Sequence, residues 1–328
     1  MELELTQTQN QSRVTLPEYD EGVLNKNHFI EANTKSVTLE HLTNDTILPV
    51  FSKDNEVTIS HAEFINAAKE ALRNVFPFHQ QTAPNVRVSH IIKGRVPTAI
   101  GKPKSELLEE DKTIYYERMA FVIGLPQIQQ EVNGNTLSLV AGGVRAYNNE
   151  NLYSKKTLEK FKVFIGFSNF VCTNLCISTD GFKDEIRVSN SNELKDRITE
   201  LFSSYDQEKH LENMERMSKF FLTPEQVAHL LGKMKMYQFL SNSRKKELFP
   251  LNINDSQINT IAKSYFKDDN FKVTTEGVIN LWQLYNLFTG AVKSSYIDSF
   301  LQREACAYEF IQEISNSIQN DEPNFFLI

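Results

Sequence analysis

The spacing of apolar residues predicts one helix early in the chain. Apolar residues recur every three or four positions from residue 64 to 76, namely Phe64, Ile65, Ala68, Leu72, Val75 and Phe76. This spacing places them on one face of an α-helix. Ser60 and Glu63 form a capping-box pattern before the run, and Pro77 follows it. We therefore expect an amphipathic helix between Ser60 and Pro77.

The pattern changes to strands between about residues 86 and 190. Candidate strands cover residues 86–92, 114–124, 127–132, 136–144, 162–171 and 185–188. Asn133-Gly134 separates two of them, and this dipeptide accepts the positive φ angles of a tight hairpin turn. Gly142-Gly143 indicates a bulge or a close backbone approach. Consecutive strands without intervening helices predict an antiparallel sheet.

Helical spacing returns after residue 191. Leu194, Ile198, Leu201, Phe202 and Tyr205 make one apolar stripe, and Thr223-Pro224-Glu225-Gln226 is a strong helix start. Further helices are expected over 256–266, 278–292 and 296–318. The fold class is therefore α+β, with an N-terminal helix, an antiparallel β-sheet in the middle and a helical C-terminal half. The late helices either cover the sheet or form a bundle of their own.

Four regions follow from these patterns. Residues 1–25 are rich in Gln, Thr, Asn and Glu and are expected to form a flexible arm. Residues 26–190 hold the helix and the sheet, 191–320 the helical region, and 321–328 an acidic and apolar tail.

Composition indicates a folded protein of the cytoplasm. The 328 residues are 40% hydrophobic and carry a net charge of −7, which lowers the expectation of nucleic-acid binding without excluding it. No apolar run approaches the roughly 20 residues of a membrane span, and the N-terminus lacks signal-peptide features. Three cysteines are too few for a disulfide framework.

Local motifs for catalysis or metal binding are absent from the sequence. Cys172 and Cys176 are spaced C-x3-C, but no second ligand pair follows, so we interpret them as small core residues on one face of a strand. The sequence contains neither a nucleophile elbow nor a phosphate-binding loop. The carboxylates Asp54, Glu56, Glu106, Glu109, Glu110 and Asp111 are interpreted as a solvated face. No catalytic residue, metal or cofactor is predicted.

Two basic strips stand out in this acidic chain. The segment from His79 to Ser105 holds five cations and no acidic residue. The second strip surrounds Tyr153, Lys155, Lys156, Lys160 and Lys162, and Arg145 and Tyr147 lie just before it. The candidate nucleic-acid-binding residues are Arg87, Lys93, Arg95, Lys102, Lys104, Arg145, Tyr147, Tyr153, Lys155 and Lys156, with Lys160 and Lys162 just beyond. Cations interleaved with tyrosines suit a phosphate backbone whose bases stack on rings. The alternative is ordinary surface charge.

The C-terminus offers a second kind of contact. Acidic residues at 321–322 precede four apolar residues, Phe325, Phe326, Leu327 and Ile328. This tail either docks into a partner protein or packs on its own chain.

Two stretches resemble a known family. GGVRAYNNENLY followed by VFIGFSNFVCTNLCI is similar to the central part of a phage- and plasmid-borne family of unknown function, with Cys172, Thr173, Asn174 and Leu175 matching its Cys-Thr/Gln-Asn-x-Leu segment. NLWQLYNLFT, residues 280–289, resembles the family's late helix, although Trp-Gln-Leu-Tyr-Asn replaces Trp-Gly-x-Tyr-Asn. The resemblance covers about 115–310 and implies a mobile-DNA setting.

Three functions remain open at this point, and the first of them is favoured. The first is a non-enzymatic DNA-associated protein that binds or anneals single strands. The second is an interaction or regulatory protein with a protein partner. The third is an enzyme whose site is assembled in space, for which Arg145, Asn148, Asn169 and Asn174 would be the first residues to inspect.

Overall fold

The computed structural model describes residues 28–47, 58–99, 101–149, 158–170, 172–273 and 276–327. The strands are β1 (Lys35–Val37), β2 (Asn85–Val88), β3 (Ile91–Arg95), β4 (Lys112–Tyr116), β5 (Arg118–Val132), β6 (Asn135–Ala146), β7 (Glu159–Asn169), β8 (Leu175–Cys176), β9 (Phe182–Val188), β10 (Phe221–Leu222) and β11 (Ile279–Asn280). The α-helices are α1 (Leu39–Asn44), α2 (His61–Val75), α3 (Ser191–Ser204), α4 (Gln207–Met217), α5 (Pro224–Tyr237), α6 (Asn242–Lys245), α7 (Asp255–Lys267), α8 (Leu281–Val292) and α9 (Ile297–Gln319). Short 3-10 turns are η1 (Pro97–Ala99), η2 (Lys104–Glu106), η3 (Glu109–Asp111) and η4 (Tyr147–Asn149).

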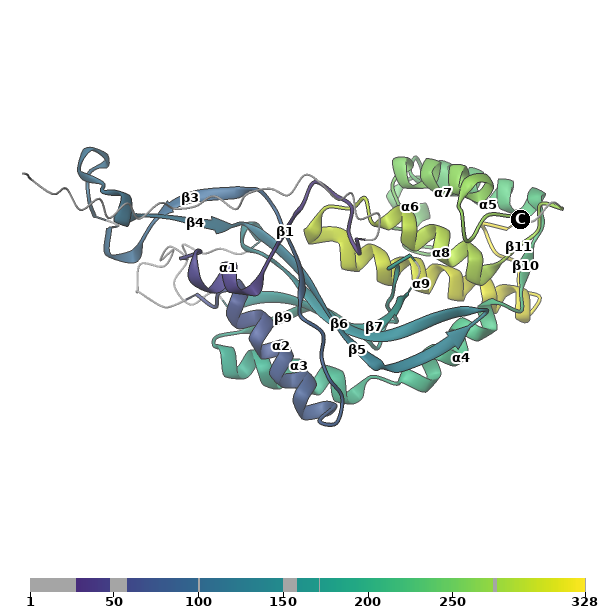
Figure 1. Cartoon of the computed structure of the whole chain (residues 1–328). Helices are drawn as coiled ribbons and strands as arrows, with labels where there is room; N and C mark the ends of the chain where they lie inside the picture. The colour runs from purple at the N-terminus through teal and green to yellow at the C-terminus, as the bar shows by residue number, and fades with distance from the viewer. Residues whose placement is uncertain are drawn as a thin grey trace, which may run out of the picture.

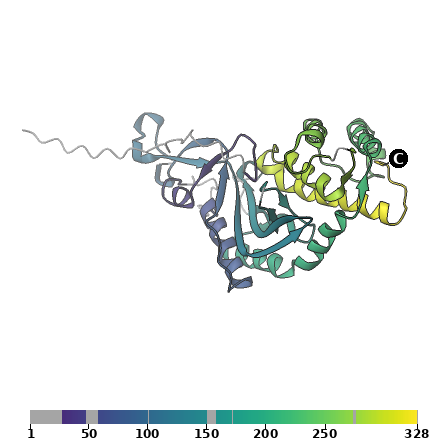
Figure 2. The ribbon, with the colours of Figure 1, turned by 45° about the vertical axis from the view of Figure 1, so that its right-hand side comes forward.

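An antiparallel sheet with helices on both faces forms the centre of the molecule. Its strands follow the order β1-β2-β5-β6-β7-β8, and β9 also pairs with β7. Helices α2 and α3 lie on one face, and α8 and α9 lie on the other (Figures 1 and 2). The C-terminal helices therefore cover the sheet and share its apolar core.

Burial along β6 shows the effect of this three-layer arrangement. Residues 139–146 are all buried, although an antiparallel strand with one wet face would alternate buried and exposed positions. Both faces of β6 meet helices, so small and apolar residues occupy consecutive positions. Gly143 is required there, because a Cβ at this position would lie 2.5 Å from Phe64 Cζ of α2.

The hairpin predicted at Asn133-Gly134 is present. Asn133 has a φ of 47° and Gly134 a φ of 74°, and the turn joins β5 to β6. Strand β5 is longer than the sequence indicated and runs through Pro126. A register shift between Leu125 and Gln129 accommodates this proline, which has no N–H to give to the ladder.

One predicted strand is two strands in different sheets. The segment 86–92 contains the end of β2, which pairs with β5, and the start of β3, which pairs with β4 in a separate two-stranded sheet. Ser89 marks the change of direction. Its N–H donates to the Arg118 carbonyl, and its Oγ accepts from the Arg118 N–H.

The α+β class is confirmed, and the structure contains elements that the sequence analysis did not predict. Strand β1 and helix α1 precede α2, and the strand pair β10–β11 lies within the helical half. Helix α2 begins after Ser60, whose capping box with Glu63 is present. The arm predicted over 1–25 lies outside the described residues.

Candidate nucleic-acid interface

The β3–β4 hairpin carries most of the first basic strip. It projects from one end of the molecule, away from the helical half (Figure 1). Its register pairs Lys93 with Ile114 and Arg95 with Lys112. Opposite residues of an antiparallel pair share a face, and so do alternate residues of one strand. Lys93, Arg95 and Lys112 therefore lie on the same face of the hairpin.

The placement of Arg95 opposite Lys112 departs from ordinary sheet design. Like charges directly across a ladder are destabilising. Neighbouring groups compensate in part, because Arg95 Nη1 donates to the Lys102 carbonyl at 2.5 Å and Lys112 Nζ pairs with Glu109.

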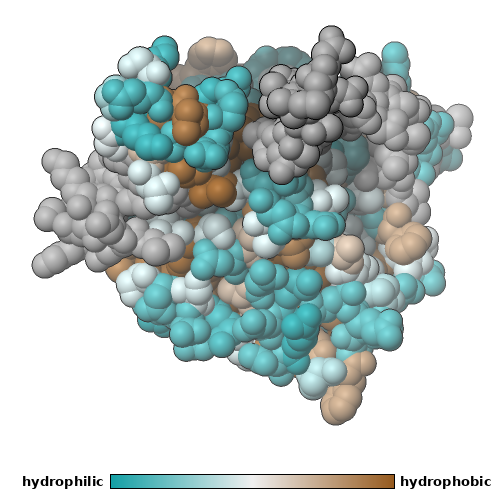
Figure 3. Space-filling model, turned by 60° about the vertical axis from the view of Figure 1, so that its left-hand side comes forward, coloured by the Kyte–Doolittle hydropathy of each residue, from teal (hydrophilic) through white to brown (hydrophobic). Residues whose placement is uncertain are grey.

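Carboxylates in the loop of the hairpin neutralise two of its lysines. Lys102 Nζ lies 2.7 Å from Asp111 Oδ1, and this hydrogen bond lowers the pKa of Asp111. Lys112 pairs with Glu109. Among the described residues, no carboxylate lies within 4.0 Å of Lys93, Arg95 or Lys104. Lys93 and Lys104 are exposed, and Arg95 is partly exposed and donates to the Lys102 carbonyl. The view onto this end shows a largely hydrophilic surface with apolar patches between the polar groups (Figure 3).

Arg87 belongs to the protein interior and not to the hairpin. It lies on β2 with 7% exposure, and it donates from Nε to Thr34 Oγ1 and from Nη2 to the Thr34 carbonyl, both at 3.0 Å. Burial lowers the pKa of Arg87. Its role is to hold the segment before β1 against the sheet.

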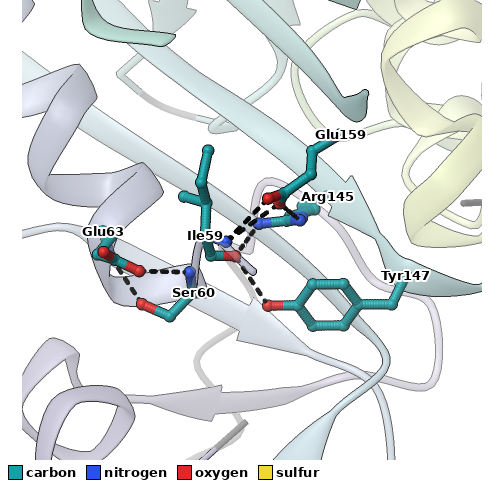
Figure 4. Close-up of polar contacts among 6 residues, drawn as sticks. All are labelled: Ile59, Ser60, Glu63, Arg145, Tyr147 and Glu159. Atoms are coloured by element: carbon teal, nitrogen blue, oxygen red, sulfur yellow. Dashed lines mark hydrogen bonds and ion pairs between the residues drawn. The ribbon is translucent and has the colours of Figure 1, made fainter. Parts of the chain in front are cut away.

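Arg145 and Tyr147, also expected to contact DNA, form a buried cluster at the start of α2 (Figure 4). Arg145 is 1% exposed, and it pairs with Glu159 of β7 and donates to the Ile59 carbonyl. Its guanidinium lies 4.5 Å from the Tyr147 ring centroid and 4.3 Å from that of Phe161. The Ile59 N–H donates to Glu159 at 3.1 Å. These contacts attach the residue before α2 to β6 and β7.

His61 completes this cluster as a neutral side chain. Its ring stacks on Tyr147 with centroids 4.5 Å apart, and Nε2 hydrogen-bonds the Tyr116 carbonyl at 2.8 Å. Burial, and then the positive charge of Arg145, lower its pKa to about 3. The cluster therefore stabilises the fold. Arg145 and Tyr147, both predicted to contact DNA, are buried in it and do not lie on the surface.

The second basic strip is described only in part. Tyr153, Lys155 and Lys156 lie outside the described residues. The two lysines that follow are on β7 and form ion pairs with β9: Lys160 with Glu185 at 3.0 Å and Lys162 with Asp184 at 3.2 Å. Their charge is balanced within the fold.

The two family-like stretches, far apart in sequence, meet inside the molecule. Asn174 Nδ2 donates to the Asn286 carbonyl at 3.0 Å, and Asn286 Nδ2 donates to the Trp282 carbonyl at 2.9 Å. Lys293 Nζ donates to the Cys172 carbonyl and to Thr173 Oγ1. Cys172 therefore lies in a turn, where Thr173 has a φ of 54°, and not on one strand with Cys176 as predicted.

A buried carboxyl lies behind this junction. Glu304 of α9 is fully buried, and neither of its carboxylate oxygens has a hydrogen-bond partner among the described residues. Burial raises its pKa well above the usual range, and only Lys293 opposes this effect. Burial also raises the pKa of nearby Cys176 and Tyr285. These groups are packed in the core and not around an open pocket.

The remaining predicted enzyme positions are also structural. Asn148 Oδ1 accepts from Arg118 Nε at 3.3 Å, and the Asn169 N–H donates to the Asn174 carbonyl at 2.9 Å. A surface hollow of about 370 Å³ lies between β9 and α3, where Arg187 pairs with Glu185 and Arg197 with Glu200. Across the described parts of the chain, no three His, Cys, Asp or Glu side chains gather as a metal site would require.

The C-terminal tail packs against its own chain. Phe326 is 1% exposed and meets the Phe310 ring edge-on with centroids 4.8 Å apart. Asn324 donates to Ser317 Oγ at 3.1 Å and accepts from the Phe326 N–H at 2.9 Å. A partner protein would have to displace Phe326 from the core. Phe325 and Leu327 are half-buried, and Ile328 lies outside the described residues.

A third basic segment escaped the sequence interpretation. From Gln226 to Lys246 the chain has five cations and no carboxylate: Lys233, Lys235, Arg244, Lys245 and Lys246. A count of charges along the sequence would have found this segment. The sequence analysis used the segment only to predict a helix from its apolar spacing.

The fold and these clusters define a three-layer α+β protein with a projecting basic hairpin. None of the helices in the described ranges is long and apolar enough to cross a bilayer. Residues 16–327 match the model of the DUF3871 family, described as "Domain of unknown function, B. Theta Gene description", and the chain belongs to this family. No curated protein and no solved structure matches the chain.

Proposed function

We propose that this protein binds single-stranded DNA without catalysing a reaction, as an accessory protein in the biology of a mobile element. The observation that carries this proposal is the register of the β3–β4 hairpin, which gathers Lys93, Arg95 and Lys112 on one face of a projecting element. Lys104 lies exposed in the loop of the same hairpin. A cluster of cations on a protruding hairpin neutralises phosphates and releases counterions.

The distribution of charge explains how an acidic protein can offer such a surface. The hairpin from residue 91 to 116 holds five cations and four carboxylates. The carboxylates occupy the loop, whereas three of the cations occupy the strands. Binding depends on the local field and not on the sum over the chain. The net charge of −7 repels a polyanion elsewhere on the surface and so favours one orientation.

The competing functions have weaker support in the geometry. A protein partner for the tail would compete with the intramolecular packing of Phe326. An enzyme would need convergent polar groups in a pocket. The residues considered for that role form hydrogen bonds with other residues of the fold, namely Arg145, Asn148, Asn169 and Asn174.

The direct test is fluorescence anisotropy of a labelled single-stranded oligonucleotide at low salt. Replacing Lys93, Arg95 and Lys104 by Gln removes three cations that form no ion pair with a described carboxylate, and we expect the affinity to fall at least about tenfold. The matched control replaces Lys183, Lys209 and Lys219 by Gln, three exposed lysines away from the hairpin, and keeps wild-type affinity. Equal binding by both variants, or no binding by the wild-type protein, contradicts the proposal.

A further inference from the structure

The surface around α5 and α6 has features that neither the fold nor the proposed hairpin site uses. Successive positions on the solvent side of α5 are His229, Gly232 and Met236, and Phe239 follows at the same spacing just after the helix. Within α5 this spacing places His229, Gly232 and Met236 along one stripe. Phe239, in the turn after the helix, extends it through the hydrogen bond from its N–H to the Met236 carbonyl. All four residues are exposed.

The apolar members of this stripe are unusually open to solvent. The exposed fraction is 89% for Phe239 and 62% for Met236. A single exposed apolar residue is ordinary, but here two lie three positions apart, and the Phe239 N–H donates to the Met236 carbonyl at 3.0 Å. We call this pair of exposed residues the patch. The patch contributes nothing to the core that the described residues build.

Gly232 points to a contact in the same place. A Cβ at this position would meet no atom within 4 Å, so packing within the chain does not require a glycine. A glycine inside a helix costs about 1 kcal/mol relative to alanine. A ligand that approaches the helix backbone closely would give this residue a purpose.

Cations border the stripe, and the carboxylates near them are few. Lys235 pairs with Asp255 at 3.4 Å and Arg244 with Glu247 at 2.5 Å, and all four side chains are at least 45% exposed. Such exposed pairs are weak and exchange readily with another anion. No carboxylate of the described residues lies within 4.0 Å of Lys246.

We infer that the α5–α6 corner is a second contact surface for single-stranded nucleic acid. Bases stack on the Phe239 ring and contact Met236, and Lys235, Arg244 and Lys246 neutralise the adjacent phosphates. Exposed aromatic rings bordered by cations are the common means of holding single strands without sequence preference. A duplex keeps its bases stacked on each other and does not use the ring.

The corner and the hairpin lie at opposite ends of the molecule (Figure 1). This inference rests on the proposed function and adds a second anchor for the same strand. A strand long enough to touch both surfaces gains affinity through the raised effective concentration of its second part. The protein should therefore prefer long strands to short ones.

The experiment compares labelled oligo-dT of about 12 and about 40 nucleotides, the shorter within the range that one surface covers. Three variants are measured: the hairpin variant K93Q/R95Q/K104Q, the corner variant K235Q/R244Q/K246Q, and F239A. Because Phe239 is almost fully exposed, F239A should keep the wild-type unfolding temperature. K183Q/K209Q/K219Q is the charge-matched control.

We expect F239A to weaken long-strand binding by about 5- to 100-fold, the loss expected for one stacked base. The corner variant should also weaken long-strand binding, because it loses three contacts to phosphates. The hairpin variant should retain the residual short-strand binding that the corner supplies. Wild-type affinity in F239A and in the corner variant, with loss in the hairpin variant, would overturn the second surface and leave the hairpin site standing. A different result would be that the wild-type protein self-associates, F239A does not, and both bind DNA equally well. This result would overturn the second DNA surface and identify the α5–α6 corner as a protein contact. Absence of wild-type binding to either strand overturns both sites.

Discussion

Arg145 shows how a residue's role depends on partners distant in the chain. It donates to the Ile59 carbonyl and pairs with Glu159, which lie 86 and 14 positions away. In the sequence it stands among other cations and tyrosines, which is why it was assigned to a DNA-binding strip. Burial of a charge requires a partner and hydrogen bonds in three dimensions, and a linear pattern does not contain them. Arg87 was assigned to the other basic strip for a similar reason, its position among cations in the sequence.

Replacing Arg145 by Met should destabilise the protein by about 3–5 kcal/mol, because the partly buried Glu159 carboxylate loses the Arg145 guanidinium that balances its charge. The measurement is urea unfolding followed by circular dichroism. Adding E159Q to R145M should restore part of the loss. As control, K112M removes an exposed pair with Glu109 and should cost at most about 1 kcal/mol. Equal costs for R145M and K112M would contradict a structural role for the buried pair.

Glu304 gives the stability a pH dependence of known sign. Its pKa in the folded protein lies above the usual 4.5, so the folded state keeps a proton that the unfolded chain releases. Stability from this group is full below pH 4.5 and falls as pH rises above it, by up to about 1.4 kcal/mol per pH unit. E304Q cannot titrate. The free energy of unfolding of E304Q minus that of wild type should therefore increase from pH 5 to pH 8, and a constant difference would refute the assignment.

At the scale of elements, the sequence predicted those features that depend on residues close together in the chain. The capping box at Ser60 and the turn at Asn133-Gly134 are both present, because each depends on residues three or fewer positions apart. The split of 86–92 into β2 and β3 was missed, since the apolar run is continuous and only pairing with β5 and β4 separates the strands. The basic hairpin face likewise became visible only when the register placed Lys112 opposite Arg95.

Two glycine substitutions should move stability in opposite directions. G143A places a Cβ 2.5 Å from Phe64 and 2.7 Å from the Lys162 carbonyl, so overpacking between α2 and the sheet should cost about 1–3 kcal/mol. G232A meets open space on α5 and should stabilise the protein by up to about 1 kcal/mol. Thermal unfolding of both variants checks this. A destabilised G232A would show that the glycine serves the fold and not a contact.

For the whole molecule, the notable feature is the separation of positive surface from an acidic body. The hairpin and the α5–α6 corner carry unbalanced cations, whereas the lysines of β7 are paired with β9. The composition predicted an acidic chain and could not predict this arrangement. It results from the sheet register and from the way the C-terminal helices pack on the sheet. The mobile-DNA setting implied by the resemblance remains a prediction, which DNA binding would support.

The most direct test of DNA binding is the salt dependence of affinity for a single strand, measured for the wild-type protein and for K93Q/R95Q/K104Q. For single strands the slope of log K against log salt is about −0.7 per neutralised phosphate, so removing three cations should make it shallower by roughly 2. That change, with an unchanged slope in K183Q/K209Q/K219Q, is the result we predict. Identical slopes in wild type and hairpin variant would show that the β3–β4 hairpin does not contact the phosphates.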